Sequence, residues 1–275
     1  MLPINSFRVQ FITPSKGLAQ KSEILKRKDF SQRTQKMNDD FTLCDPCTPF
    51  ANLAVKKTFE TLPDGSGCLD EIKSAKVALE GGCRWIQLRM KDASLEEVER
   101  VALQLKPLCK SYNAVFLLND HVELCKKIGA DGVHLGKTDM NPHEARQLLG
   151  NDFIIGSTCN TFEDIENLKD TQIDYIGLGP FRFTETKQNL SPILGLEGYK
   201  NIVSQCKKSN INIPIVAIGG ITADDVVPIL QTGIEGIALS SAILRAEDPV
   251  REMDKMIKAF GDKRDKIDKK IWINY

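Results

Sequence analysis

The feature that most constrains this chain is a regular alternation of two hydrophobic patterns between about residues 68 and 260. Short apolar runs rich in Val, Ile and Leu alternate with longer segments in which apolar residues recur at helical spacing. The short runs are bounded by Gly, Asn, Asp or Pro and are almost continuously apolar, which is typical of parallel strands buried on both faces. The predicted strands are Trp85–Leu88, Ala114–Leu118, Gly132–His134, Ile154–Ser157, Tyr175–Leu178, Ile215–Ile218 and Gly236–Leu239.

Helix-start signals lie between these runs. Ser94 precedes an amphipathic segment, and Glu97, three residues later, completes the pattern of a capping box. Thr161 and Asp164 repeat the arrangement, with Asp in place of the usual Glu or Gln. Two more helices are expected over residues 224–230 and 249–260.

An eighth strand is available upstream, at Phe7–Ile12. Strict alternation of strands and helices allows two main topologies, a doubly wound open sheet or a closed barrel. A doubly wound nucleotide-binding sheet would have a Gly-rich turn after its first strand, whereas this chain has Thr-Pro-Ser-Lys over residues 13–16. Eight units favour the barrel. We therefore expect an α/β protein, a single-domain (β/α)₈ TIM barrel with an insertion after the first strand.

Residues 16–65 do not fit the alternation of strand and helix patterns, because they are rich in charged residues, Pro and Gly. We expect residues 1–15 to carry the first barrel strand, 16–65 to form a partly disordered insertion, 66–261 to complete the barrel and 262–275 to form a tail. The insertion follows a strand and could act as a lid, but a solvated loop without function is the favoured interpretation. Cys44 and Cys47 within it have zinc-knuckle spacing, although no complete four-ligand set is visible.

Composition excludes several classes of partner. Lys and Arg total 37, Asp and Glu total 37, and the formal net charge is zero, so neither nucleic acid nor a basic membrane anchor is expected. No apolar run is long enough for a transmembrane helix, and the first residues lack the apolar stretch of a signal peptide. Eight scattered cysteines fit reduced thiols better than a disulfide framework, so we expect a cytoplasmic location. The sequence leaves open whether the chain forms a homo-oligomer.

Polar residues concentrate where the predicted strands end, which is the catalytic face of a barrel. After the second strand, alternation places Gln87, Arg89 and Lys91 on the same side. Two cations and an amide that converge at a barrel mouth would bind an anion such as a diphosphate. An Arg and Lys pair solvated at the rim is an equally weighted alternative.

Two carboxylates follow the next two strands. Asp120 comes after the third strand and Asp139 after the fourth, and neighbouring strands lie about 4.8 Å apart. Carboxylates beside an anion site suggest Mg²⁺, which is held by a few carboxylates together with phosphate oxygens and water. The alternative for Asp120 is a helix N-cap, and the two roles are compatible.

The loops after the last strands resemble a phosphate site. Gly219 and Gly220 follow the seventh strand, and Ser240 and Ser241 follow the eighth, where backbone N–H groups commonly bind phosphate in this fold. The loop after the sixth strand is long, polar and cationic over residues 184–187 and could close over a phosphorylated substrate. His134 lies within a strand and is expected to be a packed or hydrogen-bonded barrel residue rather than a catalyst.

Taken in order, these stretches resemble the thiamine-phosphate synthase family, over about residues 68–260 together with Phe7–Thr13. No single string is decisive, but six in order at the right strand ends are highly specific. The matching stretches are Gly81–Lys91, Leu118–His121, Gly129–Gly136, Asp174–Pro180, Thr184–Lys187 and Val216–Ile221.

The resemblance implies a Mg²⁺-dependent transferase that couples a hydroxymethylpyrimidine diphosphate to a thiazole phosphate, with or without an extra carboxylate, giving thiamine monophosphate and diphosphate. By resemblance, Asp120 and Asp139 would hold Mg²⁺. Thr158 stands where the family usually has Ser and retains a hydroxyl. The pyrimidine diphosphate would be held by Gln87, Arg89, Lys91, Asn119, Thr158 and Lys187, among which Arg89, Lys91 and Lys187 would be catalytic. The thiazole phosphate would be held by Thr184, Thr186, Gly219, Gly220, Ser240 and Ser241, with Lys187 nearby.

The chemistry implied by the residues agrees with this resemblance. Loss of diphosphate from an electron-rich heteroaryl-methyl carbon passes through a cation-like state, which needs charge around the leaving group rather than a protein nucleophile. Two alternatives remain at this point. A thiazole tautomerase-like isomerase would need an acid/base residue after the fifth strand, where this chain has Thr158-Cys159-Asn160-Thr161 and no His. A non-catalytic phosphate-binding barrel could lack the carboxylates.

Overall fold

The structure, a computed structural model, describes residues 9–12, 69–91, 93–183 and 192–271. Strands and helices alternate along them, and all strand pairs are parallel. The strands are β1 Val9–Ile12, β2 Trp85–Leu88, β3 Val115–Asn119, β4 Gly132–Leu135, β5 Ile154–Cys159, β6 Tyr175–Leu178, β7 Ile215–Ile218 and β8 Gly236–Leu239. The helices are α3 Leu69–Glu80, α4 Leu95–Ser111, α5 Val122–Ile128, α6 Pro142–Leu149, α7 Phe162–Leu168, α8 Gly195–Lys208, α9 Ala223–Leu230, α10 Ser241–Leu244 and α11 Pro249–Ile271.

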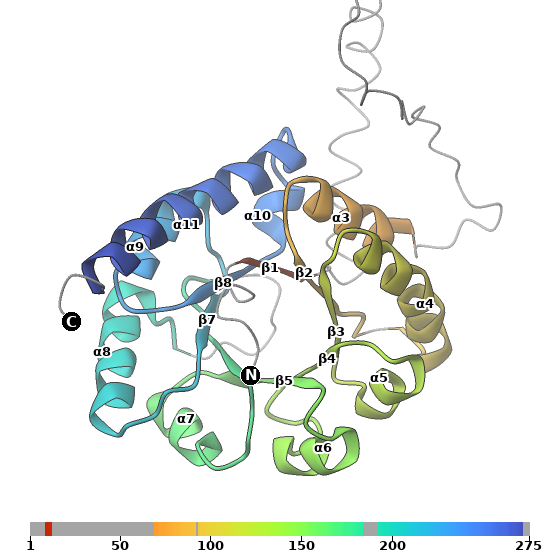
Figure 1. The fold of residues 1–275 in the computed structure, drawn as a ribbon, viewed down its shortest axis with the longest axis horizontal. Coiled ribbons are helices and arrows are strands. Elements are labelled where there is room, and N and C mark those ends of the chain that lie inside the picture. The colour runs from red at the N-terminus through yellow and green to blue at the C-terminus, as the bar shows by residue number, and fades with distance from the viewer. Residues whose placement is uncertain (1–8, 13–68, 92, 184–191, 272–275) are drawn as a thin grey trace, which may run out of the picture.

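The sheet follows the order of the chain. Each strand pairs with the next one in sequence, and β1 pairs with both β2 and β8, with Phe11 beside Ile86 on one side and Leu239 on the other. The helices surround the strands (Figure 1). The prediction of an α/β fold built on parallel strands is confirmed, and every predicted strand in the described part of the chain lies within one or two residues of its expected position.

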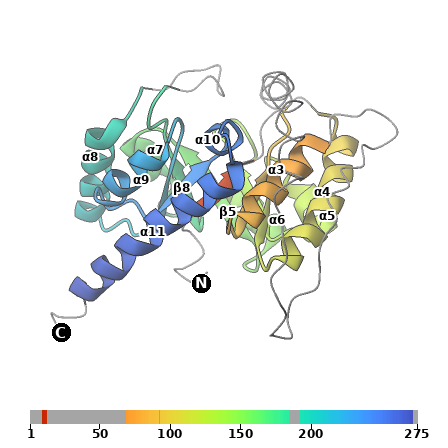
Figure 2. The same cartoon turned by 90° about the horizontal axis from the view of Figure 1, so that it is seen from above.

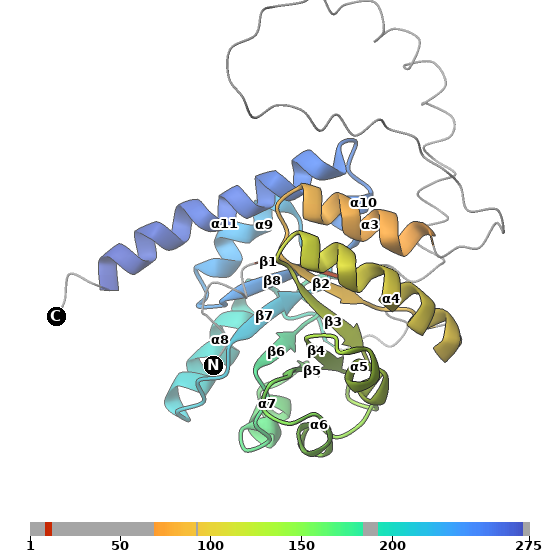
Figure 3. The same cartoon turned by 45° about the vertical axis from the view of Figure 1, so that its right-hand side comes forward.

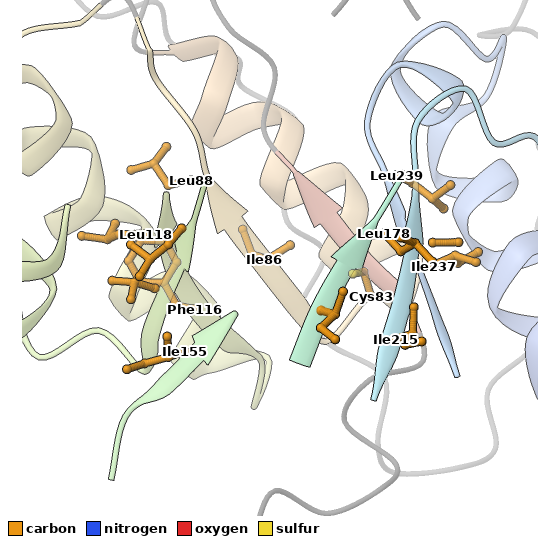
Figure 4. Packing of buried hydrophobic residues seen from close by; sticks show 14 of the residues in the cluster. Cys83, Ile86, Leu88, Phe116, Leu118, Ile155, Leu178, Ile215, Ile237 and Leu239 are labelled. Atoms are coloured by element: carbon orange, nitrogen blue, oxygen red, sulfur yellow. The ribbon is translucent and has the colours of Figure 1, made fainter. Parts of the chain in front are cut away.

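The core has two layers because side chains alternate along each strand. Outward-facing residues of the strands, such as Ile86, Phe116 and Ile155, pack beneath the helices (Figure 4). α11 lies along the outside of this layer and contacts α9 and α3 (Figures 2 and 3). A second, smaller cluster fills the space between the strands. It comprises Trp85, Leu117, Ile154, Tyr175, Val216 and Ala238.

Two glycines make room for the bulky residues of the inner cluster. A Cβ on Gly156 would collide with the Tyr175 ring, and a Cβ on Gly177 would lie 2.9 Å from the imidazole of His134. Trp85 meets Tyr175 edge to face, with ring centroids 5.5 Å apart. The interior is filled at this level, and sites in folds of this kind lie above it, at the carboxyl ends of the strands.

Three acidic residues join consecutive strands at their starts. Each directly precedes an even-numbered strand, and its backbone N–H donates to the carbonyl of a residue at the start of the preceding strand. Its carboxylate in turn accepts the backbone N–H of that strand residue. The carboxylate distances are 2.7 Å from Asp131 to Phe116, 2.8 Å from Asp174 to Ile155 and 2.8 Å from Glu235 to Ile215. These reciprocal pairs satisfy backbone N–H groups that the sheet ladder leaves open at its edge.

Removing one of these carboxylates should destabilise the fold. Asp131→Ala leaves the Phe116 N–H without its acceptor, and we expect it to lower the free energy of unfolding by about 1–3 kcal/mol. Asp131→Asn keeps an acceptor oxygen and should cost less. Asp152→Ala, at an exposed turn, is the control. Urea unfolding measures all three, and equal stability of Asp131→Ala and the control would contradict this role.

The C-terminal boundary differs from the prediction. Helix was expected over residues 249–260, but α11 continues through Gly261 to Ile271, so residues 262–271 of the predicted tail are helical. These residues contain no Pro, and opposite charges recur at i and i+4, as in the pairs Asp262 with Lys266 and Asp265 with Lys269, which favours continued helix. The predicted insertion over residues 16–65, including Cys44 and Cys47, lies outside the described residues.

Two further observations concern the described residues alone. Their five cysteines are buried, and burial raises the pKa of Cys109, Cys125 and Cys159 to about 12. None of their helices combines the length and apolar character needed to cross a membrane.

Candidate active site at the carboxyl ends of the strands

Two buried amide side chains point into the barrel above its apolar filling. Gln87 is 1% exposed and Asn119, the last residue of β3, is 8% exposed. Both alternate with outward-facing leucines, so the period of the strand directs them inward. Nε2 of Gln87 is buried and has no hydrogen-bond partner among the described residues. A buried amide donor without a partner costs free energy, which marks this position for a ligand.

Asp120 and Asp139 meet at this mouth and hydrogen-bond to each other through their side chains. Asp139 also accepts the backbone N–H of Gly136 through Oδ2 at 2.6 Å. Burial and the neighbouring Asp139 raise the pKa of Asp120 to about 7. Although burial alone would raise it, the pKa of Asp139 is lowered by the hydrogen bonds from Asp120 and Gly136 and by the charge of Lys91.

The two predicted cations are close to this pair. Arg89 and Lys91 both lower the pKa of Asp120 through their charge, against the larger effect of burial. Arg89 is partly buried and Lys91 is exposed. The structure therefore brings four residues from the ends of three neighbouring strands together, as the sequence predicted.

The N-cap interpretation of Asp120 is wrong. Helix α5 begins at Val122, and its N-cap position is occupied by His121, whose side chain makes no capping bond. Asp120 instead adopts a left-handed backbone conformation with φ of 69°. This conformation is uncommon for a residue with a Cβ and costs of order 1–3 kcal/mol, as at many functional sites.

A chain of side-chain contacts links the barrel interior to the mouth. His134 lies 2.9 Å from the Tyr175 hydroxyl through Nδ1 and 2.9 Å from the Thr158 hydroxyl through Nε2. The expectation that His134 is a hydrogen-bonded barrel residue is confirmed. The role of Tyr175 was not predicted, because a Tyr at the start of an apolar strand has the pattern of an ordinary core residue. Thr158 is half-buried, with its hydroxyl held at the level of the site.

The loops after β7 and β8 have the features expected of an anion site. Gly219 and Gly220 adopt positive φ values of 98° and 70°. Both residues belong to a turn, and successive backbone N–H groups in a turn can form a concavity that suits an anion. The Ser240 hydroxyl is buried and has no hydrogen-bond partner among the described residues, and Ser241 begins α10. Thr184, Thr186 and Lys187 lie outside the described residues.

The last residue of β5, Cys159, and the two residues after it offer no group suited to acid/base chemistry. The Cys159 thiol is buried with a pKa of about 12, and its neighbour Asn160 donates its side-chain amide to the carbonyl of Gly179. The backbone N–H groups of Asn160 and Thr161 are both occupied by Asp164, which closes the predicted capping box of α7. A proton-transferring group of the kind an isomerase would need is therefore absent from residues 159–161.

Comparison with known proteins agrees with this geometry. The profile of the thiamine monophosphate synthase family matches residues 64–243. The thiamine-phosphate synthase of Bacteroides thetaiotaomicron is 64% identical over 185 residues, which cover 67% of this chain and 88% of that protein. The thiamine-phosphate synthase of Flavobacterium johnsoniae is 48% identical over 187 residues, covering 68% and 88%.

A solved structure gives the same result. The thiamine phosphate pyrophosphorylase of Pyrococcus furiosus superposes with a TM-score of 0.66 at 27% identity, covering 94% of this chain and 98% of that one. The range matched by the family profile, residues 64–243, spans the carboxylate pair, both cations and the Gly219-Gly220 loop. The chain belongs to the thiamine monophosphate synthase family.

Proposed function

We propose that this chain joins a hydroxymethylpyrimidine diphosphate to a thiazole phosphate and releases thiamine monophosphate and diphosphate. Membership of the family and the identity of 64% to a thiamine-phosphate synthase support this reaction. The observation that carries it is the convergence of Asp120, Asp139, Arg89 and Lys91 at one mouth. Two carboxylates with two cations suit a diphosphate leaving group and the metal that accompanies it.

The scaffold we propose is a complete (β/α)₈ TIM barrel. The pairing of β1 with both β2 and β8 supports closure of the sheet. The first strand precedes the residues matched by the family profile, so its place in the barrel rests on this pairing. Closure brings the loops after β7 and β8 to the same rim as those after β2, β3 and β4, which lets two phosphorylated substrates meet.

Mg²⁺ is the cofactor that fits the donor set. Asp120 and Asp139 lie in direct contact, and two carboxylates so close require a shared proton or a cation between them. Among the described residues there is no cluster of three or more metal-ligating side chains, and Mg²⁺ commonly completes its coordination with substrate phosphate and water. When bound, Mg²⁺ would neutralise charge developing on the leaving diphosphate.

The remaining residues divide between the two substrates. Gln87 and Asn119 offer buried amides to the pyrimidine ring, and Thr158 offers a hydroxyl positioned by His134. Arg89 and Lys91, with Lys187 from the loop after β6, would hold the diphosphate. The thiazole phosphate would be bound by Gly219, Gly220, Ser240 and Ser241, together with Thr184 and Thr186.

The residues of the site suit a dissociative substitution. The aminopyrimidine donates electrons as the bond from carbon to diphosphate breaks, and the thiazole nitrogen then attacks the resulting cationic carbon. The chain contributes fixed positive charge at the departing oxygen and walls that keep water from that carbon. A protein nucleophile has no role in this route.

The two other candidate functions are less well supported. A thiazole tautomerase would need an acid/base group after β5, where Cys159 and Asn160 are buried and Asn160 is hydrogen-bonded to Gly179. A non-catalytic phosphate-binding barrel would have no use for a strained Asp120 in contact with Asp139. We also propose a cytoplasmic location, supported by the unpaired thiols of Cys109, Cys125, Cys159 and Cys206.

The test supplies the purified chain with both phosphorylated substrates and Mg²⁺, or with the thiazole phosphate alone. We expect thiamine monophosphate, identified by mass spectrometry, only when both substrates are present. Isomerisation of the thiazole alone, followed by NMR, would instead favour the tautomerase. If folded protein gave neither reaction, the non-catalytic alternative would replace the synthase.

A further inference from the structure

Arg182 joins two loops of the site that are far apart in sequence. The N–H of Phe181 donates to the carbonyl of Ile218 at 2.9 Å, and the N–H of Arg182 donates to the carbonyl of Gly219 at 3.0 Å. The Arg182 guanidinium then donates through Nη1 to the carbonyl of Gly220 at 2.8 Å. Three consecutive carbonyls, from the last residue of β7 onward, are thus held by two residues after β6.

These contacts fix the direction of three backbone N–H groups. In a planar trans peptide the C=O and N–H bonds point in opposite directions. Because the carbonyls of Ile218, Gly219 and Gly220 face Phe181 and Arg182, the N–H groups of Gly219, Gly220 and Ile221 face away from them. Consecutive N–H groups aligned in this way form a concavity that binds anions.

The third of these peptides depends on a side chain rather than on backbone pairing. The Gly220 carbonyl is held by the Arg182 guanidinium, whereas its two predecessors are held by backbone N–H groups. Gly220 also needs its lack of a side chain, because a Cβ there would lie 2.9 Å from Cβ of Arg182 and 3.1 Å from the carbonyl oxygen of Phe183. Among the described residues, Arg182 therefore supplies the side-chain hydrogen bond to this carbonyl.

Arg182 is itself held in place by Asp225. The two side chains form a bidentate pair at 2.9 and 2.8 Å, and the guanidinium lies 5.1 Å from the centre of the Phe181 ring. Oδ2 of Asp225 also accepts the N–H and the hydroxyl of Thr222 at 2.8 and 2.7 Å, at the start of α9. The Arg182 side chain is 49% exposed and that of Asp225 is 14% exposed, so this bidentate geometry, rather than burial, gives the pair its strength.

We propose that Arg182 is a positioning residue that aims the Gly220–Ile221 peptide N–H at the phosphate of the thiazole substrate. This inference rests on the proposed function for the identity of that substrate. The charge of Arg182 is matched by Asp225, so Arg182 acts through the Gly220 peptide and not as a direct phosphate ligand. Its effect is therefore specific to one of the two substrates.

The experiment compares wild-type protein with Arg182→Met, Arg182→Lys and Asp225→Asn in steady-state assays that vary each substrate in turn. Arg182→Met should raise KM for the thiazole phosphate about tenfold, since the hydrogen bond to Gly220 and both hydrogen bonds to Asp225 are lost. KM for the pyrimidine diphosphate and kcat should stay within about twofold, because loss of substrate binding alone leaves the chemical step unchanged. Arg182→Lys should recover part of the loss by donating to Gly220 or Asp225.

Two controls separate positioning from general damage. Lys200→Met removes the exposed ion pair with Glu197 on α8 and should leave every parameter unchanged. The double variant Arg182→Met with Asp225→Asn should be no worse than Arg182→Met alone, because the two residues act as one unit. An unchanged KM for the thiazole phosphate in Arg182→Met, or an equal rise of KM for both substrates, would overturn the proposal.

Failure of the proposed function would be recognised separately, as an absence of product from the wild-type chain. The Arg182 proposal is then decided by titrating wild-type protein and Arg182→Met with inorganic phosphate, followed by ³¹P NMR. Weaker phosphate binding by the variant supports the positioning role, and equal binding by the two proteins contradicts it.

Discussion

Asp120→Asn should reduce kcat/KM for the coupling reaction by about 10³-fold or more, because loss of a metal ligand removes several kcal/mol of transition-state stabilisation. The variant retains the shape of Asp120 and a hydrogen bond to Asp139 while removing one negative charge. Asp139→Asn should have an effect of similar size, because the two carboxylates share the site. Activity is measured as thiamine monophosphate formed at saturating Mg²⁺.

The same substitution should leave the fold intact. The introduced amide resembles the protonated form of Asp120, whose pKa of about 7 shows that burial and Asp139 disfavour its charge. We therefore expect the melting temperature of Asp120→Asn to equal or slightly exceed that of the wild type. Asp152→Asn, at an exposed turn, should change neither quantity. Retention of more than about a tenth of wild-type activity by Asp120→Asn would contradict the role in metal binding.

Arg146→Met should lower the free energy of unfolding by about 3 kcal/mol or more, since a buried charged donor with several partners is lost. The Arg146 side chain is 9% exposed and spans the base of β5 and β6. It donates to the carbonyls of Gly150, Phe153 and Gln172 and pairs with Asp174 at 2.8 Å. Without it, three carbonyls and a carboxylate lose a partner together.

Lys126→Met is the matched control for Arg146→Met. Lys126 donates to the carbonyl of Leu148 at 2.7 Å, but this contact is exposed, so water replaces the lost donor. We expect it to cost less than about 0.5 kcal/mol. Chemical denaturation of both variants measures the difference, and equal stabilities would show that burial of Arg146 is not what gives its contacts their strength.

Most of the fold was predictable from sequence because parallel strands buried on both faces are nearly continuous apolar runs. The predicted ends of strands were less accurate where polar residues face inward. Asn119 closes β3 and Thr158 lies within β5, although both have the polarity expected of a loop. The length of α11 was underestimated: helix was predicted over residues 249–260, whereas the charged residues beyond them continue it to Ile271.

The candidate site was also only partly predictable from the sequence. Period-two alternation after β2 and the carboxylates after β3 and β4 predicted the cluster of Arg89, Lys91, Asp120 and Asp139. The pairing of Arg182 with Asp225, 43 residues apart, could not be predicted. Such contacts depend on the tertiary fold, and neither residue is distinguished by its local sequence. The left-handed backbone of Asp120 was not predicted either.

The most direct test of the proposed reaction measures both products in a single assay. Purified chain is mixed with the pyrimidine diphosphate and the thiazole phosphate, with Mg²⁺ or with an excess of chelator, and thiamine monophosphate and diphosphate are quantified together. We expect the two products in equal amounts with Mg²⁺ and neither with chelator. Diphosphate released without thiamine monophosphate, or no product from folded protein in the presence of Mg²⁺, would contradict the proposed coupling.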